Sequence, residues 1–282
     1  MENKATLRVE LLSSTKDLDI IAYAGKLCYS KTTISDLKKK LVQSEIDLFV
    51  EKLTDLGHLS PLEHVSFTFG IEGISRAATH QLVRHRIASY SQQSQRYVKQ
   101  DQFNYVIPSD VLKNEKALEV FLTQMKQIQR SYKEITTNLM DGYIYDYLTK
   151  TLDTKDIINE SKYLHKTLKE MNKRKYNELE KVAIENARYV FPNACETKII
   201  VTMNARALLN FFNERCCVRA QKEIREVAYK MLMLVKKEAP AIFKKAGPKC
   251  FGLGYCPEND MKDSECHKIT HKQLLDLIKT NV

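Results

Sequence analysis

Residues 65–97 read VSFTFGIEGISRAATHQLVRHRIASYSQQSQRY. Apolar and small polar residues alternate from residue 65 to residue 69, which predicts a half-buried strand. Ser75 has the character of a helix N-cap and predicts a helix that runs to about Arg84. A strand that passes directly into a helix indicates a fold in which a sheet carries helices on its surface.

The end of this predicted helix is rich in cations. On a helix Gln81, Arg84 and His85 are three and four residues apart and share one face. Residues 89–95 have no periodicity and predict an ordered loop. Arg84, His85 and Arg86 suit either a solvated helix end, where cations interact favourably with the macrodipole, or a binding site for anions.

The remaining pattern favours an α+β fold, a sheet packed with long helices. Further strands are predicted at 7–12 and 198–203, and helices at 15–29, through most of 115–182, and from 204 to about 238. We expect one domain over residues 1–240, with a polar helical excursion at about 153–175, and a cysteine-containing C-terminal tail over 241–282.

The charge balance predicts anionic partners. The 282 residues include 45 Lys and Arg against 35 Asp and Glu, a formal net charge of +10, which suits nucleotides, nucleic acid or a membrane surface. No stretch approaches the roughly 20 apolar residues of a membrane span, and the charged N-terminus does not resemble a signal peptide. We therefore expect a cytoplasmic protein.

Seven cysteines, two of them adjacent, indicate reduced thiols rather than a disulfide framework. Cys195 and Cys216 are expected to be packed in the core. Cys250, Cys256, Cys266 and His267 leave two alternatives, a zinc site or free thiols. Their spacing is not that of a standard zinc finger, so we expect thiols and no metal.

The segment 204–219 carries polar residues on two sides of a predicted helix. At about 100° per residue, Arg206 and Asn210 share one face, and Arg215 and Arg219 lie roughly opposite. Such a helix cannot rest on a single core, so we expect it to contact ligands or partner subunits on both sides.

The stretch from Arg84 to Arg96 resembles the signature RHRxxSxNxxSxR of the flavin-dependent thymidylate synthases. The sequence matches at RHR, Ser89, Ser94 and Arg96, and has Ser91 where the family usually has Asn and Gln92 in place of a frequent Glu. Three other segments resemble the family's remaining site segments in the same order: HLSPLEH at 58–64, ARYVFP at 187–192, and the segment 204–219. The resemblance covers about residues 5–235.

The resemblance implies the fold of the thymidylate synthase-complementing proteins, assembled as a homotetramer with active sites shared between subunits. It implies methylation of dUMP to dTMP, with 5,10-methylenetetrahydrofolate as carbon donor and FAD, reduced by NADPH, as hydride donor. Every one of these small molecules is anionic, which accounts for the basic balance without nucleic acid or a membrane.

The resemblance also assigns site residues. Arg215 would be catalytic, stabilising negative charge on the uracil ring. The FAD site would comprise His58, Ser60, Arg84, His85, Arg86, Gln92, Asn204, Ala205, Arg206, Asn210 and Arg219. The dUMP site would comprise Gln81, Leu82, Val83, Arg84, Gln92, Gln93, Ser94, Gln95, Arg96, Arg188 and Arg215, with Arg96 and Arg188 on the phosphate.

Two alternatives remain. The chain could be a nucleic-acid-binding protein that uses a dispersed basic surface. It could also keep the fold without the activity, because Ser91 and Gln92 depart from the family signature.

Overall fold

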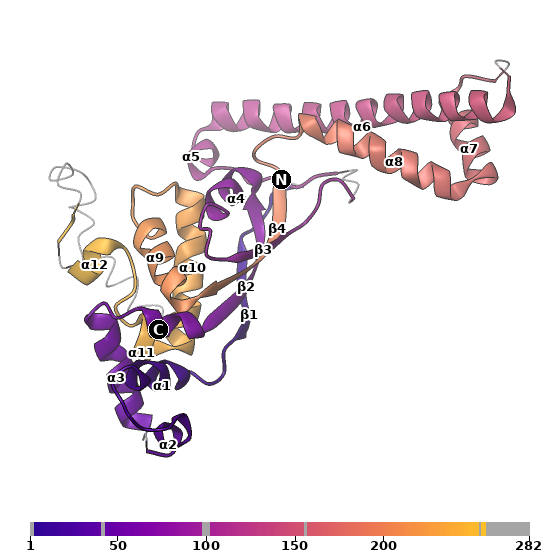
Figure 1. The fold of residues 1–282 in the computed structure, drawn as a ribbon. Helices are drawn as coiled ribbons and strands as arrows, with labels where there is room; N and C mark the ends of the chain where they lie inside the picture. Colours follow the sequence, from indigo (N-terminus) through magenta and orange to yellow (C-terminus); the bar gives the residue numbers. More distant parts are fainter. Residues whose placement is uncertain (1–2, 41–42, 98–101, 155–156, 254, 258–282) are drawn as a thin grey trace. The chain divides into compact units, whose positions relative to one another are not determined.

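The computed structural model describes residues 3–40, 43–97, 102–154, 157–253 and 255–257. The chain divides into two compact units. The sheet unit is formed by Thr6–Gln92 and Lys198–Val282, and the helical unit by Met1–Ala5 and Gln93–Thr197. The described elements, labelled in Figure 1, confirm the predicted α+β class.

The sheet has four strands in the order β1-β2-β4-β3. They are β1 (Arg8–Ser14), β2 (Ser66–Ser75), β3 (Ser89–Gln92) and β4 (Glu196–Asn204). β1 pairs with β2, and β3 with β4, in antiparallel register. β2 and β4 are also antiparallel, because Thr68 bonds to Thr202 while Lys198 pairs with Glu72. The three strands predicted at 7–12, 65–69 and 198–203 are thus confirmed, with shifted ends.

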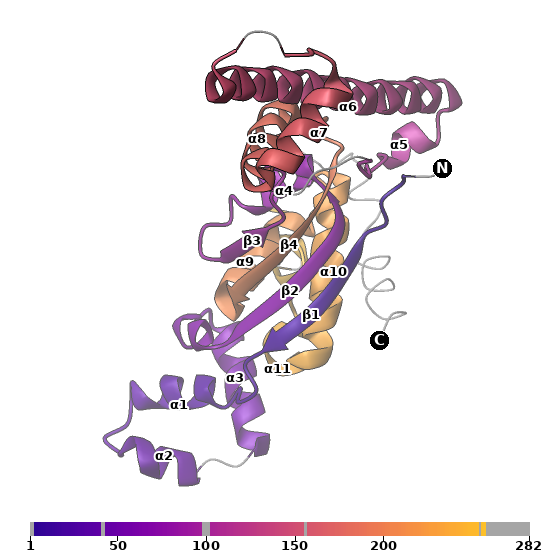
Figure 2. The ribbon, with the colours of Figure 1, turned by 90° about the vertical axis from the view of Figure 1, so that its right-hand side faces the viewer.

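One face of the sheet forms the core. Alternate residues of β2 and β4, among them Phe67, Phe69, Val201 and Met203, are almost completely buried, as the alternating pattern requires. Helix α10 (Lys222–Glu238) packs against β1 and β2 on this side, which Figure 2 shows as a helix running behind the strands. The same unit contains the following helices: α1 (Ile20–Leu27), α2 (Ile34–Lys40), α3 (Gln43–Asp55), η1 (Ser60–His64), α4 (Arg76–Leu82), α9 (Ala205–Arg215), α11 (Pro240–Phe243) and α12 (Lys249–Leu253).

The junction between β2 and α4 is fixed by Ser75. Its hydroxyl accepts a bond from the Ala78 N–H at 3.1 Å, which confirms the predicted N-cap. The Glu223 carboxylate, in the first turn of α10, accepts from the Ser75 N–H at 2.6 Å and from the Ser75 hydroxyl at 2.7 Å. This carboxylate therefore joins the end of a strand and the starts of two helices.

Two predictions around residues 84–95 were wrong. Helix α4 ends at Leu82, so Arg84 and His85 lie in the turn that follows and share no helical face with Gln81. Residues 89–92 are not loop but strand β3, in register with residues 199–202 of β4. The backbone bonds to β4 supply the order that the sequence does not signal, since small polar residues have weak strand propensity.

The predicted long helix from 204 to 238 is two helices, α9 and α10, joined by residues 216–221. Side chains of α10 hold the carbonyls of this turn. The Arg225 guanidinium donates to the Val218 carbonyl, and the Tyr229 hydroxyl donates to the Cys216 carbonyl, each at 2.9 Å. Arg219 is therefore not on a helix. The helix predicted at 15–29 is also shorter, covering Ile20–Leu27.

The helical unit contains α5 (Ser109–Leu112), α6 (Glu115–Leu152), α7 (Ser161–Met171), α8 (Lys173–Ala187) and η2 (Arg188–Val190). The helices predicted over 115–182 are confirmed. Within the expected polar excursion at about 153–175, Leu164 and Leu168 of α7 are buried against a cluster formed with α6 and α8. Although α6 has 38 residues, none of the helices described is long and apolar enough to cross a membrane.

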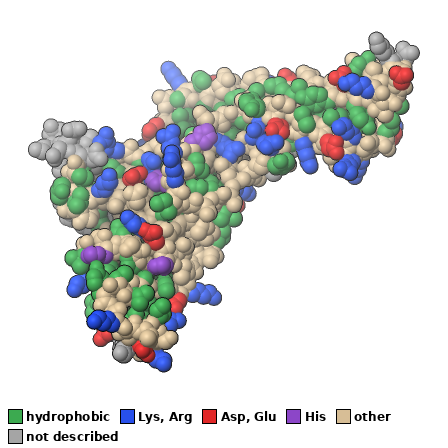
Figure 3. All heavy atoms as spheres, viewed as in Figure 1, with side chains coloured by type: hydrophobic (Ala, Val, Ile, Leu, Met, Phe, Trp, Pro, Cys, Tyr) green, Lys and Arg blue, Asp and Glu red, His purple; other side chains and the backbone are tan. Residues whose placement is uncertain are grey.

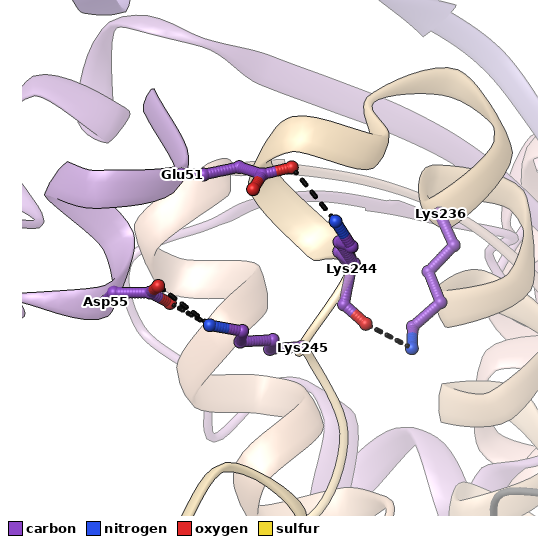
Figure 4. Close-up of polar contacts among 5 residues, drawn as sticks. All are labelled: Glu51, Asp55, Lys236, Lys244 and Lys245. Carbon is purple, nitrogen blue, oxygen red and sulfur yellow. Dashed lines mark hydrogen bonds and ion pairs between the residues drawn. The ribbon is translucent and has the colours of Figure 1, made fainter. Parts of the chain in front are cut away.

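The described C-terminal segment packs on the sheet unit. Ile242, Phe243 and Ala246 belong to the main core. Figure 4 shows two ion pairs to α3, Lys244 with Glu51 and Lys245 with Asp55. Cys266 and His267, two of the groups considered as metal ligands, lie outside the described residues.

We expect Glu223→Ala to lower the free energy of unfolding by about 1.5–3 kcal/mol, because it removes the charged acceptor of two hydrogen bonds. Urea denaturation would measure this. Glu226→Ala, an exposed carboxylate on the same helix, is the matched control and should change stability by less than about 0.5 kcal/mol. Equal effects in the two variants would contradict the role given to Glu223.

Candidate active site

The turn after α4 is held by a tyrosine. The Tyr90 hydroxyl lies 2.8 Å from the Leu82 carbonyl and 2.8 Å from the His85 carbonyl, and it shares its proton between these two acceptors. Burial raises the pKa of Tyr90 to about 12, so the hydroxyl remains a donor at neutral pH. One strand side chain thereby fixes the backbone that carries Arg84 to Arg86.

The side chain of His85 extends from this turn to α9. Its ring packs edge to face on Phe211, with centroids 4.9 Å apart. The Arg215 Nε–H donates to His85 Nε2 at 3.0 Å, which requires that Nε2 carry no proton. Burial, and then the nearby Arg215 charge, lower the pKa of His85. Geometry and electrostatics therefore agree on a neutral imidazole that orients the Arg215 guanidinium.

His85 and Arg215 border a hollow of about 800 Å³ in the sheet unit. The size lies within the range of about 300–1,000 Å³ that is usual for small-molecule sites. Its wall combines four arginines and a histidine with amide and carboxylate groups. It is lined by Leu59, Glu63, Arg84, His85, Arg86, Ile87, Asn204, Arg206, Ala207, Leu209, Asn210, Asn213, Glu214 and Arg215.

Seven of the expected site residues thus meet in one hollow. Arg206 and Arg215 border it together, although they are nine residues apart on α9 and were expected on opposite faces. The Arg206 guanidinium forms an ion pair with Glu63. The Asn204 side chain accepts a bond from the Ala207 N–H at 2.8 Å and so caps α9. The hollow is therefore built at a capped helix start as well as along the helix.

Other expected site residues of the sheet unit do not line this hollow. Leu82 and Ala205 are completely buried in the core. Val83, like His58 and Ser60, is exposed, and Gln81 bonds to Gln221. Gln92 donates to the Thr79 hydroxyl of α4 at 3.1 Å. Arg219 borders a different hollow, next to the cysteines of the C-terminal segment.

In the helical unit, Arg96 and Arg188 meet at Glu185. The Arg96 guanidinium contacts the Glu185 carboxylate twice, at 2.7 and 3.1 Å. The Arg188 Nε–H donates to the backbone carbonyl of Glu185 at 3.2 Å. The carboxylate raises the pKa of Arg96. The Ser94 hydroxyl accepts from the Arg96 N–H. The two arginines expected at a phosphate therefore both contact Glu185, Arg96 through the carboxylate and Arg188 through the backbone carbonyl.

Two neighbours of Ser94 have different surroundings. The Gln95 amide is buried and donates to the Cys195 sulfur at 3.4 Å. Gln93 is half-buried. Cys195 and Cys216 are completely buried, as predicted.

Three residues of these sites were missed at the sequence level. Tyr90 occupies a variable position of the signature, and only its place on an unexpected strand explains its role. Glu63 lies within the segment HLSPLEH, where His58 and Ser60 were chosen instead. Glu185 lies in the last turn of α8, three residues before Arg188, which follows the end of that helix. This spacing brings the two residues together at a helix end and could have indicated the contact.

The surface is basic but not uniformly so. On the face shown in Figure 3, Lys and Arg side chains lie in scattered groups interleaved with Asp and Glu, not in one continuous stripe. Within the part of the chain that the structure describes, no group of three or more His, Cys, Asp and Glu side chains is arranged to hold a metal ion.

Comparison with known proteins gives a consistent result. Residues 10–241 match the model of the family described as "Thymidylate synthase complementing protein". Three relatives carry the name flavin-dependent thymidylate synthase. That of Clostridium tetani is 48% identical over 267 residues, covering 93% of this chain and 96% of the relative. That of Geobacter sulfurreducens is 46% identical, covering 90% and 93%, and that of Pyrococcus furiosus is 37% identical, covering 95% and 96%.

The neutral state of His85 predicts a pH dependence of stability. Because its pKa is lower in the folded than in the unfolded chain, protons bind preferentially to the unfolded state, and stability falls as pH falls through about 6.5. We expect His85→Gln, which keeps an acceptor for Arg215, to reduce this loss. Urea denaturation between pH 8 and pH 5 would measure it.

His80→Gln is the matched control, since it removes an exposed imidazole of α4 and retains His85. It should follow the wild-type pH dependence. A His85→Gln protein that loses as much stability as the wild type over this range would show that His85 is not held neutral by the fold.

Proposed function

Because the chain belongs to the thymidylate synthase complementing protein family, we propose that it converts dUMP to dTMP with 5,10-methylenetetrahydrofolate as carbon donor and reduced FAD as hydride donor. The chain is an enzyme of the flavin-dependent thymidylate synthase type. NADPH is the proposed reductant of the flavin. The observation that carries the proposal is the meeting of Arg84 to Arg86 with residues of α9 around one hollow.

The hollow fits a flavin dinucleotide in its chemistry. Arg84, Arg86 and Arg206 offer guanidinium donors, which pair with phosphate oxygens in forked geometry, and Asn210 offers an amide. The Arg206 side chain is already directed by Glu63. His58, Ser60, Asn204 and Arg219 complete the proposed FAD site, with His85 at its edge. When bound, the flavin supplies the hydride.

The proposed phosphate site for dUMP is the cluster at the end of α8. Arg96 holds the Glu185 carboxylate through two parallel contacts, and a phosphate can replace a carboxylate in this forked arrangement. Arg188 and Ser94 are the other proposed ligands. Gln93 and Gln95, in the same unit, are further proposed ligands of the nucleotide.

Arg215 is the proposed catalytic residue. A uracil ring that accepts a hydride gains negative charge on its N3–O4 edge, and a fixed guanidinium can stabilise this charge with two donors. The bond from Arg215 Nε to His85 leaves the terminal nitrogens as the donors for a substrate. His85 thus acts as a positioning residue for Arg215.

The departures from the family signature are compatible with this site. Ser91 is exposed on β3, opposite Ile200, and Gln92 anchors the strand to α4 through Thr79. Gln92 thus helps to hold the strand that carries Tyr90. We therefore propose that the activity is retained.

The proposal includes a homotetramer with shared active sites. The side chain of Ile87, which lines the hollow, is 73% exposed. A large apolar side chain exposed to this extent suits contact with another subunit better than contact with solvent. Sedimentation of the purified protein tests this assembly, and a fully active monomer would contradict it. The nucleic-acid-binding alternative gains no support from the scattered charge in Figure 3.

The function is tested by supplying the purified chain with dUMP, methylenetetrahydrofolate, NADPH and FAD and measuring dTMP by chromatography. We expect dTMP to appear only with all four present. A flavin-loaded protein that oxidises NADPH without forming dTMP would contradict the proposal. A steeply salt-dependent affinity for nucleic acid, without dTMP formation, would favour the alternative instead.

We expect Arg215→Ala to lower dTMP turnover by about 10²–10³, the usual effect of removing one preorganised donor, while flavin content stays normal. Arg215→Lys should rescue turnover incompletely, because an ammonium group keeps the charge and loses the fork. Lys230→Ala, an exposed cation on α10, is the control. Near-normal turnover in either Arg215 variant would remove its catalytic role.

A further inference from the structure

A second hollow in the sheet unit gathers three cysteines. It has a volume of about 230 Å³ and is bordered by Cys217 from the turn between α9 and α10, and by Cys250 and Cys256 from the C-terminal segment. All three side chains are partly exposed and in the thiol form.

Cys217 and Cys250 are also linked by a common neighbour. Burial first, and then the adjacent thiols Cys216, Cys217 and Cys250, raise the pKa of Tyr229 on α10. The hydroxyl of Tyr229 is fixed by its bond to the Cys216 carbonyl. Cys217 and Cys250 therefore come from two different segments and border the same hollow.

The C-terminal segment is held against α10 by Lys236. Its ammonium group donates to the Lys244 carbonyl at 3.0 Å, as Figure 4 shows, and lies 5.1 Å from the centre of the Phe251 ring. Burial lowers the pKa of Lys236. These contacts bring α12, which carries Cys250, to the wall that Cys217 borders.

Cys216, the residue before Cys217, is buried, in contrast to the three partly exposed cysteines of the hollow. It is completely buried, and burial raises the pKa of its thiol strongly, so it is protected from exchange chemistry. The pair of adjacent cysteines thus directs one thiol into the core and one into the hollow.

We propose that Cys217 and Cys250 form a reversible disulfide that ties α12 to the turn after α9 and restrains Arg215. Arg215, Glu214 and Asn213 border both hollows, and Cys217 is two residues from Arg215. A bond at Cys217 therefore acts on the turn that ends the catalytic helix. The effect on turnover rests on the function proposed above, whereas formation of the disulfide does not.

The reaction is thiol–disulfide exchange with a small-molecule disulfide. The thiolate of one cysteine attacks a sulfur of the small disulfide, forms a mixed disulfide and releases one small thiol. The second cysteine then attacks the protein sulfur of that mixed disulfide and releases the second small thiol. The two cysteines are oxidised by two electrons in total and the small disulfide is reduced, with both cysteine protons transferred to the released thiolates.

The full chain is incubated with oxidised glutathione or with dithiothreitol, alkylated and analysed by intact mass and peptide mapping. We expect the oxidised protein to lose two hydrogen atoms and to give a peptide pair linked through Cys217 and Cys250. Cys217→Ser and Cys250→Ser should lose this pair. Cys28→Ser, which removes an exposed thiol of another segment, and Cys256→Ser should retain it.

A bond between Cys250 and Cys256, or glutathione adducts alone, would overturn the proposed pair.

In the wild type, oxidation should lower turnover by up to about 10²-fold, because small displacements of positioned groups have effects of that size, and dithiothreitol should restore it. Cys250→Ser should be insensitive to oxidised glutathione. A mapped Cys217–Cys250 bond without loss of turnover would overturn the restraint on Arg215. Absence of dTMP formation in the reduced protein would contradict the proposed function and leave the mapping result valid.

Discussion

The antiparallel pairing of β4 with β2 and β3 is the constraint on which the site depends. The bond from the Ala205 N–H to the Val65 carbonyl ends β4 directly beside the start of β2. The pairing of Ser89 with Thr202 fixes β3 on the other side. Residues more than 110 positions apart in the chain thus become neighbours, and the turn at 84–88 meets the start of α9. Without this register, the signature arginines and Arg215 would have no common hollow.

Charge within the hollow is organised by partners that the protein itself supplies. A guanidinium on a flexible side chain loses conformational freedom when it binds a ligand. Here Glu63 holds Arg206, and a neutral His85 holds Arg215. In the helical unit, the Glu185 carboxylate holds Arg96, and the Glu185 backbone carbonyl accepts from Arg188. If these residues bind anions as proposed, such contacts reduce the entropy lost on binding, which gives a reason for carboxylates among the arginines.

The sequence predicted the fold class, three of the strands, the Ser75 cap and the helices at 115–182 because each has a strong local signal. It failed where tertiary contacts decide. Strand β3 is specified by its pairing with β4 rather than by propensity, and the break between α9 and α10 by side chains of α10 that bind the turn carbonyls. The resemblance to the family indicated Arg84 to Arg86 and Arg215 as site residues. The roles of Tyr90, Glu63 and Glu185 depend on tertiary contacts and were therefore found only in the structure.

The end of α9 at Arg215 also places this residue between the two hollows of the sheet unit. In a continuous helix the residues after Arg215 would extend along the same axis, and Cys217 and Arg219 would be separated from the C-terminal segment. The turn at 216–221 instead buries Cys216 in the core and brings Cys217 to a hollow that Cys250 also borders. Because the end of a helix is its least constrained part, the orientation of Arg215 depends on His85 on one side and on this turn on the other. If Arg215 is catalytic as proposed, its placement at such a junction makes it sensitive to any contact that fixes or releases the turn.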